Sequence, residues 1–139
     1  MTMEQSFKAI KKKLKKLPLK AKEKLLTGAI RAGANTVRDE ARQKAPVDTG
    51  LLKRSIQTIK GNIKYNRLYE VKFFVVTKSK IKLRGLQKSA FYAHMIEYGT
   101  IKMPAQPFMR PAFENADKKS IEAAHKYIHK KMEKFTRSL

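Results

Sequence analysis

Three histidines and a few acidic residues are the side chains of this sequence that could support catalysis or bind a metal. His125 and His129 are four residues apart, so they would share one face of a helix, and Glu122 lies one turn earlier. No glutamate stands between the two histidines as a general base, and the 139 residues include no cysteine. The pattern favours ordinary histidines at the boundary of a helix, with a metal site as the alternative.

Acid–base catalysis would need further acids near these histidines, and the centre of the chain offers only Asp48, Glu70 and Glu97. Neither a GxxxxGK[ST] nor a GxGxxG run is present to bind phosphates. A hydrolase that uses His94 with Glu97 is the remaining catalytic alternative. We predict that the protein is not an enzyme and has no catalytic residues, bound metal or cofactor.

The charge of the chain predicts an anionic partner. Thirty-three Lys and Arg against eleven Asp and Glu give a formal net charge of +22, and the basic residues are spread along the chain. Lysine outnumbers arginine, whereas base-edge recognition favours arginine, so any nucleic-acid binding would be directed at the phosphate backbone. A nonspecific nucleic-acid-binding protein is therefore an alternative function. A solvated lysine surface that meets acidic protein partners is the other interpretation.

Residues 1–18 predict a basic amphipathic helix. Apolar residues recur at helical spacing between lysines, and Pro18 then interrupts the pattern but suits the first turn of a new helix. We expect this helix to dock on its own domain or on a neighbouring subunit, with an anionic membrane as the lesser alternative. No apolar stretch is long enough to span a membrane. The apolar positions are Phe7, Ile10, Leu14 and Leu17.

Two longer helices are predicted at residues 19–44 and 111–135. Ala45-Pro46 ends the first helix, and the small residues of its stripe would allow another element to approach closely. The first stripe comprises Leu26, Ile30, Gly33, Ala34, Val37 and Ala41, and the second comprises Ile121, Ala124, Ile128, Met132 and Phe135.

Residues 56–78 change to a pattern rich in branched and aromatic residues, which predicts two or three antiparallel strands with a turn at Gly61-Asn62. A short helix at residues 50–55, capped by Asp48 or Thr49, should precede them. Residues 78–89 are rich in lysine and should form an exposed loop or hairpin tip. A short helix at residues 91–98 should end at Gly99.

Together these elements predict one domain over residues 1–139 with an α+β fold. In it, an antiparallel sheet of about three to four strands packs against a long N-terminal helix and a C-terminal helix.

Glu97 is an acid among apolar and basic residues, so it needs a partner if it is buried. We expect the proline-rich segment to fold back on the short helix and to bring the Arg110 side chain to Glu97, within one subunit or between two. Phe108 would anchor in its own core or in a pocket of a neighbour.

Three blocks in the sequence follow the same order as those of a known family. They resemble the APxDTGxLxxSI, YAxxxEyGT and PFxRPA patterns of tailed-phage tail-completion and head-tail joining (neck) proteins, similar to the minor tail protein Z type. The resemblance covers about residues 20–130. The blocks are Ala45-Pro46-Val47-Asp48-Thr49-Gly50-Leu51-Leu52 with Ser55-Ile56, then Tyr92-Ala93 with Glu97-Tyr98-Gly99-Thr100, then Pro107-Phe108-Met109-Arg110-Pro111-Ala112.

This resemblance implies a virion protein of the neck or proximal tail, assembled in the host cytoplasm as a homo-oligomeric ring, with a hexamer expected. The implied partners are a tail terminator or tail tube protein, a head-tail connector or stopper, and genomic DNA in the channel, without a membrane. Interface candidates are Asp48, Thr49, Gly50, Glu97, Gly99, Thr100, Phe108, Arg110 and Pro111; candidates for contact with DNA or an acidic partner are Lys78, Lys80, Lys82, Arg84 and Lys88.

Overall fold

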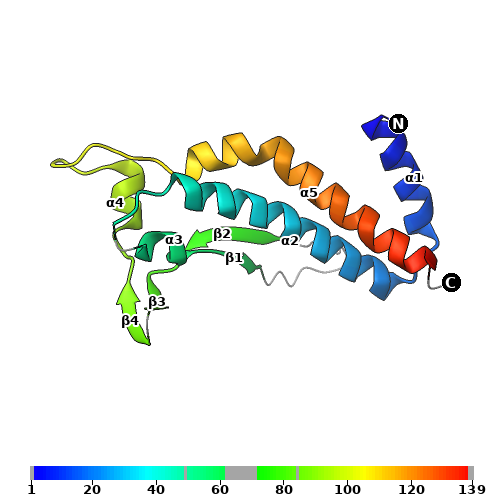
Figure 1. Cartoon of the computed structure of the whole chain (residues 1–139), viewed down its shortest axis with the longest axis horizontal. Coiled ribbons are helices and arrows are strands. Elements are labelled where there is room, and N and C mark those ends of the chain that lie inside the picture. The colour runs from blue at the N-terminus through cyan, green and yellow to red at the C-terminus, as the bar shows by residue number, and fades with distance from the viewer. Residues whose placement is uncertain (1, 49, 62–71, 84, 138–139) are drawn as a thin grey trace.

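A computed structural model describes residues 2–48, 50–61, 72–83 and 85–137 (Figure 1). The α+β class is confirmed, with long helices toward both ends of the chain and short strands between them. The elements in chain order are α1 (Met3–Lys15), α2 (Leu19–Lys44), α3 (Leu51–Ser55), β1 (Ile56–Lys60), β2 (Phe73–Thr77), β3 (Lys80–Leu83), β4 (Leu86–Ser89), α4 (Ala93–Tyr98) and α5 (Met109–Arg137).

Helices α2 and α5 lie side by side and antiparallel, and they form the long axis of the molecule (Figure 1). Small residues on both helices let them approach closely: a Cβ atom at Gly33 would lie 3.0 Å from the Ser120 carbonyl oxygen. The bounds predicted for α2 are confirmed. The small buried residues of the two helices are Ala29, Gly33 and Ala41 on α2 and Ala112 and Ala116 on α5.

The predicted stripes are only partly correct. Leu26 and Ile30 are exposed, and the neighbouring Leu25 and Ala29 are buried in their place. On α5, Ile121 is exposed although it was assigned to the stripe. The small residues decide which face meets the partner helix, because they permit the closer approach and the larger apolar residues are displaced to the flank.

The expected antiparallel strands are present, and those described form two two-stranded sheets, β1–β2 and β3–β4, where one sheet of about three to four strands was expected. Strands β1 and β2 pair from Ile56 with Thr77 to Lys60 with Phe73, and the inner face of this hairpin lies on α2. Because side chains alternate along a strand, Ile56 and Val75 face the helices, whereas Ile59 and Phe74 form an exposed outer pair. The predicted turn at Gly61-Asn62 involves Asn62, which is outside the described residues.

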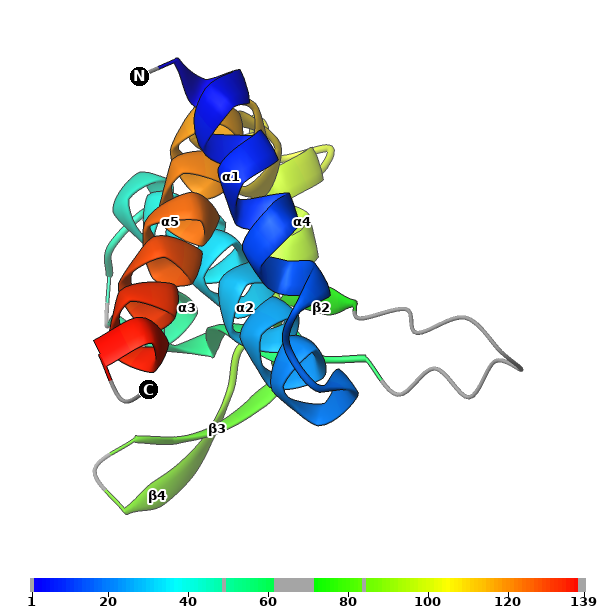
Figure 2. The same ribbon diagram turned by 90° about the vertical axis from the view of Figure 1, so that its right-hand side faces the viewer.

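Strands β3 and β4 make the lysine-rich segment a hairpin that stands away from the body of the molecule (Figure 2). Ile81 anchors its base by packing with Leu51 and Ala90. The Ala90 amide also donates a hydrogen bond of 2.6 Å to the Ser79 carbonyl oxygen. Of the two forms left open by the sequence, the hairpin is therefore the one adopted.

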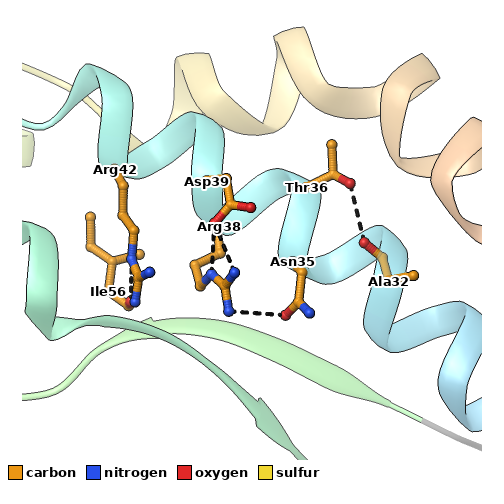
Figure 3. A network of polar contacts seen from close by, with 7 residues as sticks. All are labelled: Ala32, Asn35, Thr36, Arg38, Asp39, Arg42 and Ile56. Atoms are coloured by element: carbon orange, nitrogen blue, oxygen red, sulfur yellow. Dashed lines mark hydrogen bonds and ion pairs between the residues drawn. The ribbon is translucent and has the colours of Figure 1, made fainter.

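The main core lies where α2, α3, β1, α4 and the start of α5 meet. Phe108 and Ile56 are its largest fully buried side chains. The Arg42 guanidinium, from α2, donates two hydrogen bonds of 3.1 and 2.7 Å to the Ile56 carbonyl oxygen and so ties the long helix to the start of β1 (Figure 3). One turn earlier, Arg38 bonds Asn35 and Asp39 on the same helix.

Helix α1 crosses the other end of the α2–α5 pair (Figure 2). Its stripe packs on the chain's own domain: Ile10 and Leu17 are buried, and Leu17 contacts Leu25 and Met132. Pro18 occupies the N-cap position of α2, as predicted. None of the helices in the described part of the chain is long and apolar enough to cross a membrane.

Candidate assembly interface

Glu97, near the end of α4, caps the start of α5. One carboxylate oxygen accepts hydrogen bonds from the Phe108 and Met109 amides at 2.8 and 3.0 Å, and the other accepts one from the Arg110 amide at 3.1 Å. The first turn of a helix leaves its amides without intrahelical partners. The next residue, Pro111, has no amide hydrogen, so the first-turn donors are all accounted for.

The protonation of Glu97 reflects this geometry. Partial burial raises the pKa of the carboxyl, but the backbone hydrogen bonds from Met109, Phe108 and Arg110 outweigh it and hold the pKa below its ordinary value of 4.5. Glu97 therefore carries its negative charge at neutral pH, next to the positive end of the α5 dipole.

The expected pairing of Glu97 with the Arg110 side chain is wrong within the chain. The segment does fold back, but Arg110 reaches Glu97 through its backbone amide. Its guanidinium instead lies 3.4 Å from Glu114, and both of these side chains are well exposed. The sequence signal was available, because a helix that begins shortly before a proline has free amides that need an acceptor.

Residues 100–106, which we call the arm, project beyond α4 at one end of the molecule (Figure 1). Gly99, which directly precedes the arm, has φ 76°, and a Cβ atom there would lie 2.7 Å from the Ala105 nitrogen. Thr100 and Met103 bond each other's backbone, and the Gln106 amide donates to the Ile96 carbonyl at 2.8 Å. The arm is thus fixed at both ends. Gly99 ends α4 as predicted.

The arm exposes an isoleucine instead of burying it. Ile101 has a relative exposure of 105%, and the neighbouring Tyr98 reaches 82%. Beside the arm lies a groove of about 720 Å³, which we call the α4–α5 groove. Its walls are mainly apolar and carry charge at the rim; they include Ala93, Tyr98, Phe108, Met109, Phe113 and Glu114. The sequence analysis did not select Ile101 or Phe113. An apolar residue in a polar, proline-rich loop, such as Ile101, is a pattern that could have indicated an exposed contact residue.

The other interface candidates are divided between core and surface. Phe108 is only 1% exposed, so its side chain anchors in the chain's own core and adds almost no accessible area to the α4–α5 groove that it lines. Asp48 is exposed, and the N-cap residue of α3 is Gly50, which takes the left-handed conformation at φ 75°. Asp48 is therefore not the N-cap residue. The alternative, Thr49, is outside the described residues, so a cap from its side chain stays a prediction.

The lysine-rich hairpin exposes part of its charge. Lys78, Lys80 and Lys82 are exposed. The ladder pairs Lys88 with Ile81 through the backbone. The side chain of Lys88 and the whole of Arg84 are outside the described part of the chain, so three of the five predicted contacts can be placed on the surface.

A second basic surface was not predicted. Lys20, Lys24 and Arg31 recur along one side of α2, and together with Lys60 and Tyr127 they line a groove of about 550 Å³. The Arg31 guanidinium also lies over the Phe73 ring, 5.5 Å from its centroid. The spacing of the three α2 residues is the signal that could have revealed this surface.

The histidines occupy ordinary positions. The His125 ring packs near that of Phe7, 5.5 Å between centroids, and His129 lies 3.4 Å from Glu133. Within the described ranges, no three His, Asp or Glu side chains converge as metal ligands do. His94 and Glu97 both line the α4–α5 groove, but both carboxylate oxygens of Glu97 already bind backbone amides.

These features define a small, basic α+β subunit whose most prominent surface is a fixed apolar arm beside an apolar groove. The model of the HK97-gp10_like family, described as "Bacteriophage HK97-gp10, putative tail-component", matches residues 8–99, which is more than half of the chain. The protein therefore belongs to this family of phage tail components. The matched span includes the first sequence block and the second block as far as Gly99, whereas the third block and α5 follow it. No curated protein and no solved structure gave a match.

Proposed function

We propose that this tail component completes the tail at its head-proximal end and joins it to the DNA-filled head, acting as a homo-oligomeric ring, with six subunits expected. The observation that carries the proposal is the arm, because a surface loop fixed by Glu97, Gly99 and Gln106 presents Ile101 without burying it. A loop ordered before docking loses little entropy when it docks. A rigid arm is therefore suited to contacts between subunits and has no part in a chemical step.

The proposed partners are copies of the same chain, a tail terminator or tail tube protein, and the head-tail connector or stopper. The likeness to the Z type and the position in the neck belong to this proposal. The contribution of the chain is binding and positioning; it needs no catalytic group or cofactor.

Deleting the gene tests the proposal. Full heads and finished but separate tails should accumulate, and electron microscopy of the lysate would count them. Supplying the protein in trans should restore joined particles. Joined, infectious particles made without the protein would contradict the proposal, as would its absence from purified virions.

The basic hairpin is proposed to contact either the passing genome or an acidic surface of a neighbouring ring. Its exposed lysines and the net charge of +22 support contact with phosphates without sequence preference. Neutralising Lys78, Lys80, Lys82, Arg84 and Lys88 together should reduce the yield of infectious particles. Normal, infectious particles from that variant would exclude both roles.

The basic groove on α2 favours one alternative function, a nonspecific nucleic-acid-binding protein that acts alone. Such a protein should bind duplex DNA as a monomer or dimer, with an affinity that falls steeply with salt. Gel filtration, together with a salt titration of DNA binding, distinguishes the two functions. A neck protein should form rings by binding other copies of the chain or its partner proteins.

A further inference from the structure

We infer that the arm of one subunit inserts into the α4–α5 groove of a second copy of this chain, with Ile101 as the apolar anchor and Lys102 beside Glu114. This contact would hold the ring together, so the inference rests on the proposed function and assigns its self-association surface.

The arm supplies the inserting group. Ile101 is fully exposed in a loop whose two ends are fixed by the Gly99 turn and by the bond between Gln106 and Ile96. The Thr100–Met103 bridge fixes the residues on either side of Ile101, and in this conformation the isoleucine is fully exposed. Burial of this side chain therefore requires a surface of another molecule.

The groove supplies a receiving surface of suitable chemistry. Its walls include Phe113, exposed by 68%, and Tyr98, exposed by 82%, so apolar area remains accessible there. Its volume of about 720 Å³ leaves room for more than one side chain of an entering loop.

Charge favours a second copy as the occupant. The chain is strongly basic, yet the groove is bordered by Glu114, whose side chain is 64% exposed and only 3.4 Å from Arg110 in a weak surface pair. Lys102 follows Ile101 directly and is exposed, so an inserted arm brings an ammonium group to this carboxylate. The arm and the groove are different surfaces, so each inserted copy leaves its own groove free for the next; such head-to-tail contacts form a ring when the rotation between neighbours closes.

Cysteine cross-linking is a direct test, because the natural chain has no cysteine. An Ile101→Cys chain and a tagged Phe113→Cys chain would be supplied together to a phage that lacks the gene, and would also be mixed as purified proteins. Oxidation should give a disulfide between the two different chains, since a disulfide requires Cα atoms within about 7 Å. A Leu19→Cys chain, exposed at the other end of the molecule, replaces Ile101→Cys as the matched control and should give no such product.

A charge swap tests the same contact without a new covalent bond. Glu114→Lys and Lys102→Glu should each weaken self-association, and the double variant should recover it. Ile101→Ser should weaken it roughly 10- to 100-fold, by the loss of one buried aliphatic side chain. Leu19→Ser should leave it unchanged. Sedimentation at about 0.1 M and about 0.5 M salt would measure these effects: those of the charge swap should be larger at the lower salt, because salt screens the exposed Lys102–Glu114 pair, whereas that of Ile101→Ser should persist at the higher salt.

The outcomes separate the inference from the proposed function. If deletion leaves heads and tails unjoined but Ile101→Ser restores joined particles and no cross-link forms on particles or in solution, the arm contact is wrong and the joining role stands. If deletion has no effect while the cross-link forms, the contact is right and the joining role is wrong. A cross-link equally strong from Leu19→Cys, or capture of the arm only by a different tail protein, would overturn the inference.

Discussion

The two ends of the α2–α5 pair are held together in different ways. At the arm end, Phe108, Ile56 and Ala112 are almost completely buried, and hydrogen bonds from Arg42 and to Glu97 cross between elements. At the α1 end, Leu17, Leu25 and Met132 pack together but remain slightly exposed, beside a groove of about 350 Å³. The comparison shows that the end that carries the exposed arm has the more deeply buried core and the hydrogen bonds between elements. Firm fixing of that end is what a docking surface requires.

Truncating a core side chain at each end should give the largest effects. Phe108→Ala should lower the free energy of unfolding by about 3–5 kcal/mol, because it leaves a cavity in the densest part of the core. Leu17→Ala should cost about 2 kcal/mol, because its site is shallower and can collapse. Urea unfolding would measure both. Equal losses at both ends would contradict the comparison.

Two glycines with nearly the same φ give the next largest effect. Gly99→Ala should cost about 2–4 kcal/mol, because Gly99 has φ 76° with ψ 175°, a conformation essentially restricted to glycine, and the added Cβ would also overlap the Ala105 backbone. Gly50→Ala, with φ 75° but no atom within 4 Å of the added Cβ, should cost only the strain, about 1–2 kcal/mol. Thermal unfolding of the matched pair would show whether the arm is held as tightly as its contacts indicate.

Removing the Glu97 cap should have an intermediate effect on stability. Glu97→Gln keeps the shape but loses the charge that accepts three amides, and should cost about 1–3 kcal/mol. Glu114→Gln is the matched control on the exposed side of the same turn and should change stability by less than about 0.5 kcal/mol. Hydrogen exchange at the first turn of α5 should rise in the first variant alone.

The same cap predicts a pH dependence. The pKa of Glu97 is lower in the folded protein than its ordinary value, so the stability it contributes is present above about pH 4.5 and is lost as the pH falls through the folded pKa. The wild type should therefore lose more stability on acidification from about pH 5 to pH 3 than Glu97→Gln does. Parallel pH profiles for the two proteins would show that the carboxylate does not cap α5.

The ion pair between helices should give the smallest effect. Lys119 lies 2.6 Å from Glu40 and joins α5 to α2 at the surface. A hydrogen bond and the charge of this lysine lower the pKa of Glu40. Lys119→Met should change the melting temperature less than Glu97→Gln, and the difference should shrink further at high salt. A larger loss than that of the cap variant would mean that the helix pair depends on charge more than on its small residues.

Sequence patterns predicted the elements better than their contacts. The spacing of apolar residues and the positions of Pro18 and Pro46 determined α2 correctly, because these signals are local. The start of α5 was placed at Pro111 and lies at Met109, since a proline is also tolerated within the first turn. The pairing of strands into two sheets depends on contacts between distant residues, and no local pattern encodes it.

The candidate site was predicted in location but not in chemistry. Glu97 and the proline-rich segment do meet, but the contact is made by backbone amides. Every residue other than proline has such an amide, so the residue types do not show which ones will bind Glu97. Phe108 could be assigned to a core or to an interface from its type alone, and only its burial decides between them. The exposure of Ile101 depends on the turn that Gly99 makes, which becomes visible only when the backbone is known.

The close approach of α2 and α5 at Gly33 and Ser120 has a mechanical consequence. Because the helices approach this closely, we expect them to resist sliding and to respond to load as one rigid body about as long as α2, roughly 39 Å. We expect a force on the arm to be passed along the helix pair toward α1 with little shear between the two helices.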